Sequence, residues 1–501
     1  MSITRSDHDH TGAPDAPGSA TTLPAPTALR VRPLVMRLHF YAGLFIAPFL
    51  IIAAISGGLY AIAPAAEQWV YSDYLHTDST GPAAPLSAQI RAAQEIEPDL
   101  QVAAVRPAAD SGQTTTVLFD DPSLGESERR AVFIDPVTTT AQGQLVSYGS
   151  SGSLPMRTWI AQFHKNLHLG EPGRIYSELA ASWLWIIALG GLILWVQRYR
   201  KLKTARGSAN LLTIDRRSKG RNRTLNWHGV VGIWIAVVLV FLSATGLTWS
   251  RYAGENIGEL RQSLSWTTPP LKSSLSPGEE PAAASGHNHG GGHDSGDVDQ
   301  SVVSRNISAV GSVLSTARAT GVSGAVEVSI PADAETAMVV KQVRTPWQIE
   351  TNSAAIDPST DTVVDSSSSS DWPLAAQLTS WGIALHMGLL FGIVNQLVLL
   401  VVAVGLVTLA ARGYLMWWKR RPTRGSRTAL PKPPARGALQ KLNPVIAAGV
   451  VSGAVVIGWF VPLLGLSLLA FVLVDLAVGA YQRTRLRHSM KPPASQATEG
   501  K

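Results

Sequence analysis

The chain has 501 residues, of which 46% are hydrophobic and only 15% are charged, well below the roughly 25% that is usual for soluble globular domains. This balance argues against an ordinary cytosolic enzyme and favours a protein rich in membrane-spanning helices. The sequence has no cysteine, which excludes disulfides, cysteine-ligated zinc, iron–sulfur clusters and covalently attached c-type haem. Any cofactor must therefore be held by histidine, carboxylate, backbone or packing.

Apolar stretches long enough to cross about 30 Å of hydrocarbon divide the chain. An N-terminal tail at 1–33, expected to be disordered, precedes the first of them. The predicted elements that follow are span one at 34–63, span two within 166–197, a basic loop at 198–227, span three at 228–250, span four at 386–418, a second basic loop at 419–443, a two-span hairpin at 444–481 and a tail at 482–501. Span one is too long for a signal-peptide core and lacks an Ala-x-Ala exit, so we expect it to remain as an anchor.

Two long segments, 64–165 and 251–385, separate these spans and have the composition of soluble domains. Strands are expected at 113–119 and 131–135, short helices at 87–97 and 304–319, and flexible linkers at 286–299 and 366–370. The two strands are β-branched runs, each followed by an Asp-Pro turn signal. We therefore predict a small α+β domain in each segment, attached to an α-helical membrane bundle.

The distribution of charge predicts the orientation of the chain in the membrane. The two long segments hold 13 basic against 27 acidic residues, a net charge of −14, which leaves +21 on the remainder of a chain whose total is +7. Short loops rich in Lys and Arg stay in the cytoplasm, so both termini are expected inside and both acidic segments outside. The positive balance therefore indicates contact with the anionic inner leaflet of the bilayer rather than with nucleic acid.

An internal repeat singles out four histidines. When the chain is aligned with itself, a first register places His39 on His228, Gly43 on Gly232 and Gly57 on Gly246. A second register, without a gap, places the following residues on one another: Asp135 on Asp357, Trp159 on Trp381, His164 on His386, Gly170 on Gly392 and Trp195 on Trp417. We predict two copies of a unit made of span, outward domain and span.

The repeat also chooses between neighbouring histidines. His168 lies one helical turn after His164, but its counterpart in the second copy is Leu390. His164 and His386 are therefore the equivalent pair, and His168 is a reserve candidate. His39 and His228 are expected near the cytoplasmic ends of their spans, and His164 and His386 on the outward side, with His386 opening span four.

Ionisable side chains at the edge of a bilayer are costly and tend to be functional. Two layers of paired histidines on four helices, roughly 20–25 Å apart along the helix axes, form the arrangement that bis-histidine haem ligation requires. Gly43 and Gly232 lie one turn after His39 and His228 and would leave room for a flat macrocycle. The alternative is that the histidines bond to headgroups or loops while the glycines serve close helix packing.

At this point the sequence resembles the bacterial PepSY-associated transmembrane proteins over roughly residues 30–422. The motifs that carry the resemblance are Arg37-Leu-His39, His164-x5-Gly170-Glu-Pro-Gly173-Arg174, Asn226-Trp-His228-Gly, Leu385-His386-Met-Gly388 and Met416-Trp-Trp-Lys-Arg420. The resemblance implies an inner-membrane protein with outward PepSY domains. Some members are ferric-siderophore reductases with b-type haem and others are iron-regulated membrane proteins, so it implies haem ligation by His39, His164, His228 and His386.

Further candidate sites lie outside the repeat. The residues His287, His289, His293 and Asp294 could capture a transition metal weakly or form a solvated linker. Asp475, an acid within the last apolar stretch, could handle protons or bond to a neighbouring helix. Trp195, Trp417 and Trp418 mark span ends and are expected to anchor the interface. Motifs for nucleotide binding or hydrolysis are absent, so the catalytic residues stay unidentified.

The leading hypothesis is a membrane oxidoreductase with an inner haem between His39 and His228 and an outer haem between His164 and His386. It would carry electrons from an unknown cytoplasmic donor to an iron chelate, such as a ferric siderophore, outside a bacterial cytoplasmic membrane. One alternative is a membrane-anchored PepSY module that binds peptides or proteases without redox activity. Another is metal handling centred on the loop at 286–294. The sequence leaves the oligomeric state open.

Overall fold

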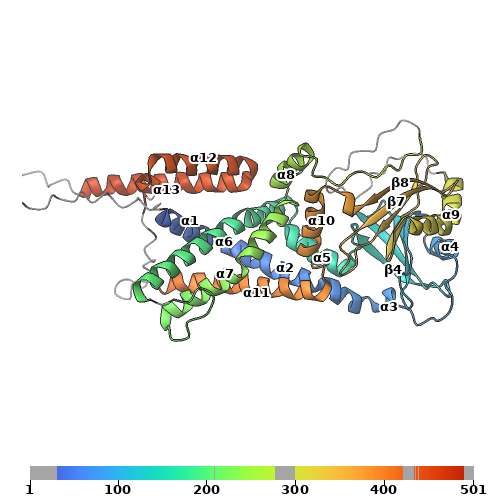
Figure 1. Ribbon diagram of the computed structural model, residues 1–501, viewed down its shortest axis with the longest axis horizontal. Coiled ribbons are helices and arrows are strands. Elements are labelled where there is room, and N and C mark those ends of the chain that lie inside the picture. The colour runs from blue at the N-terminus through green and yellow to red at the C-terminus, as the bar shows by residue number, and fades with distance from the viewer. Residues whose placement is uncertain are drawn as a thin grey trace, which may run out of the picture.

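The computed structural model describes residues 31–207, 209–276, 299–420, 434, 436–437 and 439–489. Most of the long helices gather at one end of the molecule, and a β-sheet with helices of its own lies at the other (Figure 1). The predicted disordered tail, most of the linker at 286–299 and much of the second basic loop fall outside the described residues.

Four long helices form the bundle. Helix α2 (Ala47–Val70) packs along α11 (Gly392–Trp418), α6 (Glu171–Arg206) packs along α7 (Gly220–Leu247), and α7 also contacts α11. With α13 (Pro462–Ser489), they make five helices among the described residues that are long and apolar enough to cross a membrane. The chain is a multi-pass membrane protein with an antiparallel sheet. The predicted hairpin forms, but its first helix, α12 (Pro444–Phe460), has only 17 residues and is short for a span.

Two predicted spans are interrupted. Span one consists of α1 (Arg32–Phe45) and α2, because Pro48 in the first turn of α2 cannot continue the helix that precedes it. The prediction that His386 opens span four is wrong, since His386 ends a separate helix, α10 (Leu374–His386), and span four begins at Gly392. The backbone turns between them through Gly388 and Gly392, which have positive φ angles of 75° and 54°.

The two soluble segments share one antiparallel sheet of eight strands in the order β4-β3-β2-β1-β5-β6-β7-β8. The first segment supplies β1 (Gln101–Arg106), β2 (Thr115–Asp120), β3 (Glu128–Ile134) and β4 (Ala141–Tyr148). The second supplies β5 (Val326–Ser329), β6 (Met338–Gln342), β7 (Asn352–Asp357) and β8 (Thr362–Ser368). The halves join where Val105 of β1 pairs with Val328 of β5. The predicted domains are thus two halves of one layer.

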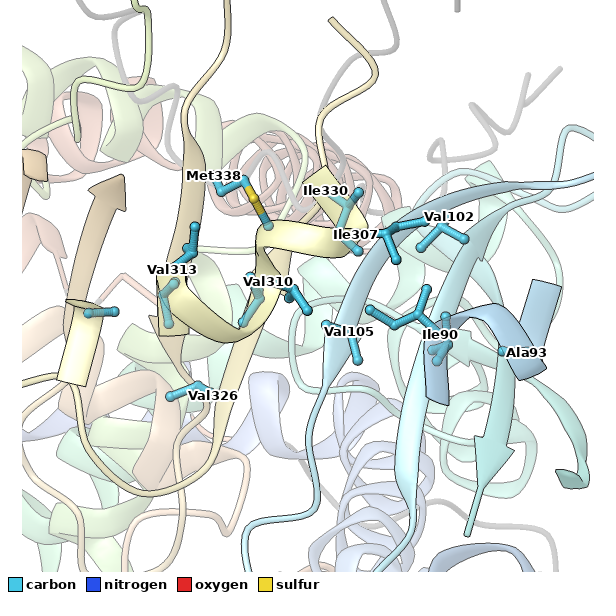
Figure 2. Close-up of a cluster of buried hydrophobic side chains, with 14 of the residues drawn as sticks. Ile90, Ala93, Val102, Val105, Ile307, Val310, Val313, Val326, Ile330 and Met338 are labelled. Atoms are coloured by element: carbon cyan, nitrogen blue, oxygen red, sulfur yellow. The ribbon is translucent and has the colours of Figure 1, made fainter. Parts of the chain in front are cut away.

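One hydrophobic core also serves both halves. Helices α4 (Leu86–Ile96) and α9 (Gln300–Ala319) cover the sheet, and Figure 2 shows Ile90 of α4 beside Ile307 and Val310 of α9. Burial of each such aliphatic side chain contributes about 1.5–3 kcal/mol to the stability of the fold.

The predicted helices at 87–97 and 304–319 are confirmed as α4 and α9, and the predicted strands at 113–119 and 131–135 as β2 and β3. The predicted linker at 366–370 is wrong, because its first three serines pair with β7 as the end of β8 and the next residues form a 3-10 turn.

Short helices join the sheet to the bundle (Figure 1). They are α3 (Ser72–Leu75), α5 (Pro155–Asn166), α8 (Tyr252–Ser263) and α10. Glu67 of α2 and Arg157 of α5 form a buried ion pair with 3.3 Å between Oε2 and Nε, and Glu67 also accepts the Leu154 backbone N–H at 2.9 Å. A buried pair with further hydrogen bonds fixes the position of α5 against α2.

The Asp135 carboxylate organises the turn after β3. It accepts hydrogen bonds from the hydroxyls of Thr77 and Ser79 and from the backbone N–H groups of Val137 and Thr138. Burial raises the pKa of this carboxyl, but the bonds from Ser79, Thr77 and the backbone outweigh it and hold the pKa well below its usual value.

Replacing Asp135 with asparagine should therefore lower stability at pH 7 by about 2–3 kcal/mol, the value of hydrogen bonds to a charged group. A carboxyl with a depressed folded-state pKa stabilises above its unfolded pKa of about 3.9, and that contribution is lost as the pH falls through the folded-state pKa. The gap between wild type and Asp135→Asn in thermal unfolding should shrink below about pH 4. A gap that stays constant down to pH 2 would contradict this role, and Asp357→Asn, at a half-exposed turn, should cost less.

The C-terminal hairpin is fastened to α1 through Asp475. Arg37, which is 7% exposed, forms an ion pair with Asp475, and Arg436 Nε lies 3.1 Å from the same carboxylate. Trp183 Nε1 donates to Ser467 Oγ at 2.9 Å and adds a second tie between α6 and α13. Of the two roles considered for Asp475, its contacts are those of a bond to a neighbouring helix.

Asp475→Asn should lower the free energy of unfolding by about 1–3 kcal/mol, because it weakens the attachment of this hairpin to α1. The value is smaller than that of a fully buried pair because the carboxylate is 27% exposed. Thermal unfolding of Arg37→Gln, Asp475→Asn and the double variant would measure the coupling between the two side chains. Strictly additive effects would show that the pair contributes nothing.

Candidate functional site

His39 on α1 and His228 on α7 meet inside the bundle. Their ring centroids are 6.3 Å apart and the ring planes are inclined by 79°. His39 Nδ1 lies 3.0 Å from the carbonyl oxygen of Ile187, and His228 Nδ1 lies 3.1 Å from that of Leu409. Because a carbonyl can only accept, both Nδ1 atoms must carry the proton.

His164 on α5 and His386 on α10 are held by hydroxyl groups. His164 Nδ1 lies 2.9 Å from Ser56 Oγ, and His386 Nδ1 lies 2.6 Å from Thr245 Oγ1. Each hydroxyl donates its own proton to a carbonyl one turn earlier, at 2.8 Å for Ser56 and 2.9 Å for Thr245, and so accepts the imidazole N–H. His386 lies within electrostatic range of His164.

The four histidines therefore share one protonation state. In each, the proton is on Nδ1, and in the described part of the chain Nε2 takes part in no hydrogen bond. A neutral imidazole whose Nδ1–H is fixed by an acceptor is the form in which histidine binds a metal through Nε2. All four histidines are half-buried.

Glycines shape the space around the rings. A Cβ at Gly57 would lie 3.1 Å from His164 Cε1, and one at Gly191 would lie 3.0 Å from His39 Cε1, so these two positions admit the rings because they lack side chains. A Cβ at Gly43 would meet nothing within 4 Å, and one at Gly232 would meet only Leu409 at 3.9 Å. The open space expected one turn after His39 and His228 is present.

The donor set of these residues is compatible with a haem. Each pair offers two imidazole nitrogens, which suits a cofactor that brings the other ligands of its metal. If one metal ion bound both rings, the centroid distance would be the sum of two metal–nitrogen bonds of about 2 Å each and the two distances from the bonded nitrogen to the ring centre. The observed distance of 6.3 Å between the centroids of His39 and His228 agrees with that sum. The Arg412 guanidinium lies over the ring of Trp227, the residue before His228, with its Cζ 4.9 Å from the ring centroid. Its buried Nε has no hydrogen-bond partner in the described structure, which offers a cation to a propionate.

Comparison with known proteins identifies the family of the chain. The family model of the PepSY-associated TM region matches residues 36–420, more than half of the chain. The chain belongs to this family. No curated protein matches it. The match includes all four histidines of this PepSY-associated protein and ends before the α12–α13 hairpin, so Asp475 lies outside the family region, whereas its partner Arg37 lies inside it.

The other predicted ligands do not join the four histidines of the PepSY-associated chain. His168 is exposed and stacks on Trp159, with 4.8 Å between ring centroids. The predicted metal residues His287, His289, His293 and Asp294 lie outside the described residues. Trp195 is not the interfacial anchor expected, because it is 7% exposed and packs against Gly229, where a Cβ would lie 2.2 Å from its ring.

Sequence reasoning missed the groups that orient the imidazoles. Ser56 and Thr245 fall on one another in the same register of the repeat as His39 and His228, so the repeat could have identified them. Ile187 and Leu409, whose carbonyls hold the inner pair, fall on one another in the second register, the one that relates His164 to His386. No side-chain pattern marks a backbone acceptor, and only the fold could identify these two.

Proposed function

We propose that this protein is a transmembrane electron carrier with two b-type haems, the inner between His39 and His228 and the outer between His164 and His386. The observation that carries the proposal is the common state of the four imidazoles, each with Nδ1–H bonded to an acceptor and Nε2 available. Histidines that only bonded to lipid headgroups would not be expected to leave the same nitrogen, Nε2, without a partner at all four positions.

The molecule is proposed to be two copies of one unit, inserted in a bacterial cytoplasmic membrane with both termini inside and the sheet outside. The basic loops and acidic outward segments support this orientation. Support for the two copies comes from equivalent partners, since Ser56 and Thr245 hold the outer histidines and the carbonyls of Ile187 and Leu409 hold the inner ones.

Each side chain has a separate task in this proposal. A haem would supply reversible one-electron transfer between Fe(III) and Fe(II). The imidazoles would hold it, and Ser56 and Thr245 would fix the ring rotation and the basicity of Nε2 at the outer site. The glycines beside the rings admit the cofactor, and the packed apolar helices exclude water and so preserve its potential.

The proposed substrate is an iron chelate, such as a ferric siderophore, on the outward side. Each electron received from a cytoplasmic reductant converts one chelated Fe(III) to Fe(II). With a haem at each histidine pair, one chain would store two electrons, enough to reduce two chelated Fe(III) ions.

This activity can be tested without knowing the physiological donor. The purified protein is reduced with a limiting amount of dithionite under anaerobic conditions and mixed with a ferric siderophore and an Fe(II)-specific chromogenic chelator. About two Fe(II) per chain should form as the protein returns to its oxidised spectrum, and His386→Ala should form Fe(II) far more slowly. A reduced protein that stays reduced in the presence of ferric chelates would contradict the proposed substrate class.

A further inference from the structure

A cavity of about 640 Å³ lies beside α7. Its wall on α7 is formed by Trp227, Val230, Val231 and Trp234, which recur at the spacing of one helical face. The opposite wall is the chain segment 212–216 that follows α6. Arg216 and Arg223 are the charged residues of its lining, and both are exposed.

The wall opposite α7 is fixed in place by hydrogen bonds. Trp195 Nε1 donates to the Leu211 carbonyl and Trp234 Nε1 to the Leu212 carbonyl, both at 3.0 Å. Asn226 Oδ1 accepts the Asp215 backbone N–H at 2.8 Å. Three side chains from two helices thus hold the segment, and the cavity is a built feature rather than a gap beside a loose loop.

The two arginines have no carboxylate partner in the described structure. Asp215 is the one acid between Arg198 and Arg223, and its Oδ1 accepts the Arg217 backbone N–H at 2.9 Å. Two arginine residues therefore line one cavity without a carboxylate partner among the described residues. Paired guanidinium groups of this kind suit the oxygens of a phosphate.

The lining chemistry narrows the occupant to an amphipathic anion. The arginines would take a phosphate, while the valines, Trp234 and the part of the Trp227 ring that Arg412 does not cover would take an aliphatic chain. None of the lining residues is a carboxylate or an imidazole, so the cavity offers no group to accept the protons released by oxidation of a quinol.

We propose that this cavity is a binding site for an anionic phospholipid, with the phosphate diester at Arg216 and Arg223 and an acyl chain along Trp227 and Trp234. Such a site belongs to the leaflet where α7 begins, among the basic residues. It does not depend on haem, so either proposal can fail alone.

The test compares two double variants of the intact protein that lose the same charge. Arg216→Gln/Arg223→Gln removes the cavity arginines, and Arg217→Gln/Arg221→Gln removes their neighbours, which do not line it. After delipidation in a neutral detergent, each protein is titrated with phosphatidylglycerol or with phosphatidylcholine of the same chains, and bound lipid is counted by native mass spectrometry.

Wild type should bind one phosphatidylglycerol at least about tenfold more tightly than phosphatidylcholine. The cavity variant should lose this preference, the neighbour variant should keep it, and millimolar inorganic phosphate should fail to displace the lipid. Equal losses in the two variants would show diffuse attraction and overturn the site. Displacement by inorganic phosphate would reassign the arginines to a free anion, and displacement by a short-chain quinol would reassign the cavity to a quinol; either result would overturn the proposal.

Discussion

His386→Ala should halve the haem content of the purified protein, from two haems per chain to one. The outer site would lose one of its two imidazoles, and a single remaining ligand cannot hold the cofactor in bis-histidine coordination. His164→Ala should have the same effect at the outer site, and His39→Ala and His228→Ala at the inner one. Haem per chain, measured as the pyridine haemochrome against protein concentration, gives the result.

His168→Ala is the matched control, because His168 lies on the same segment as His164 but is exposed and stacked on Trp159. It should keep both haems. If His168→Ala lost a haem and His164→Ala kept both, the assignment of the outer ligand would be overturned together with the repeat register on which it depends.

Thr245→Val should weaken haem retention at the outer site by about 10- to 100-fold, the usual cost of removing the group that orients a ligating histidine. Valine keeps the shape of threonine but offers no oxygen to the Nδ1–H of His386, 2.6 Å away in the wild type. The buried N–H would lose its acceptor, and the ring would be free to rotate. Transfer of haem to apomyoglobin, followed over time, would measure the loss.

Thr245→Ser restores the hydroxyl and should restore retention, which a purely packing role for the methyl group would not predict. Thr379→Val is a control on the helix that carries His386, since the Thr379 hydroxyl bonds only to the Ala375 carbonyl in the described structure. It should leave both sites unchanged. Equal haem release from Thr379→Val and Thr245→Val would mean that the bond to His386 has no special part.

The pairing of the histidines could be predicted from the sequence because residues of a ligating type occupy equivalent positions of the internal repeat. The internal repeat relates His39 to His228, and the structure brings these two rings within 6.3 Å. Strong hydropathy likewise predicted the long helices, although their ends moved. Span one broke at Pro48 and span four began at Gly392 rather than at His386, since local backbone geometry rather than hydropathy sets such boundaries.

The pairing of strands that are far apart in the chain could not be predicted from the sequence. The strands at 113–119 and 131–135 were predicted, but nothing local indicated that β1 would pair with β5 from the other segment and join both halves in one sheet. The serines at 366–368 have low strand propensity, yet they pair with β7 and extend β8, because tertiary pairing overrides such preferences. Asp475 stands out in the sequence as an acid within an apolar stretch. Its partner Arg37 is 438 residues away, so the ion pair could not be predicted.

The most direct test of the account is the oxidised-minus-dithionite-reduced absorption spectrum of the purified protein, expressed with a supply of haem. Haem held by His39 with His228 and by His164 with His386 predicts a shifted Soret band, a sharp α-band of the low-spin b type and about two haems per chain. A colourless, folded protein with no Soret band would contradict the account, and the chain would then be a PepSY-associated membrane protein without redox function.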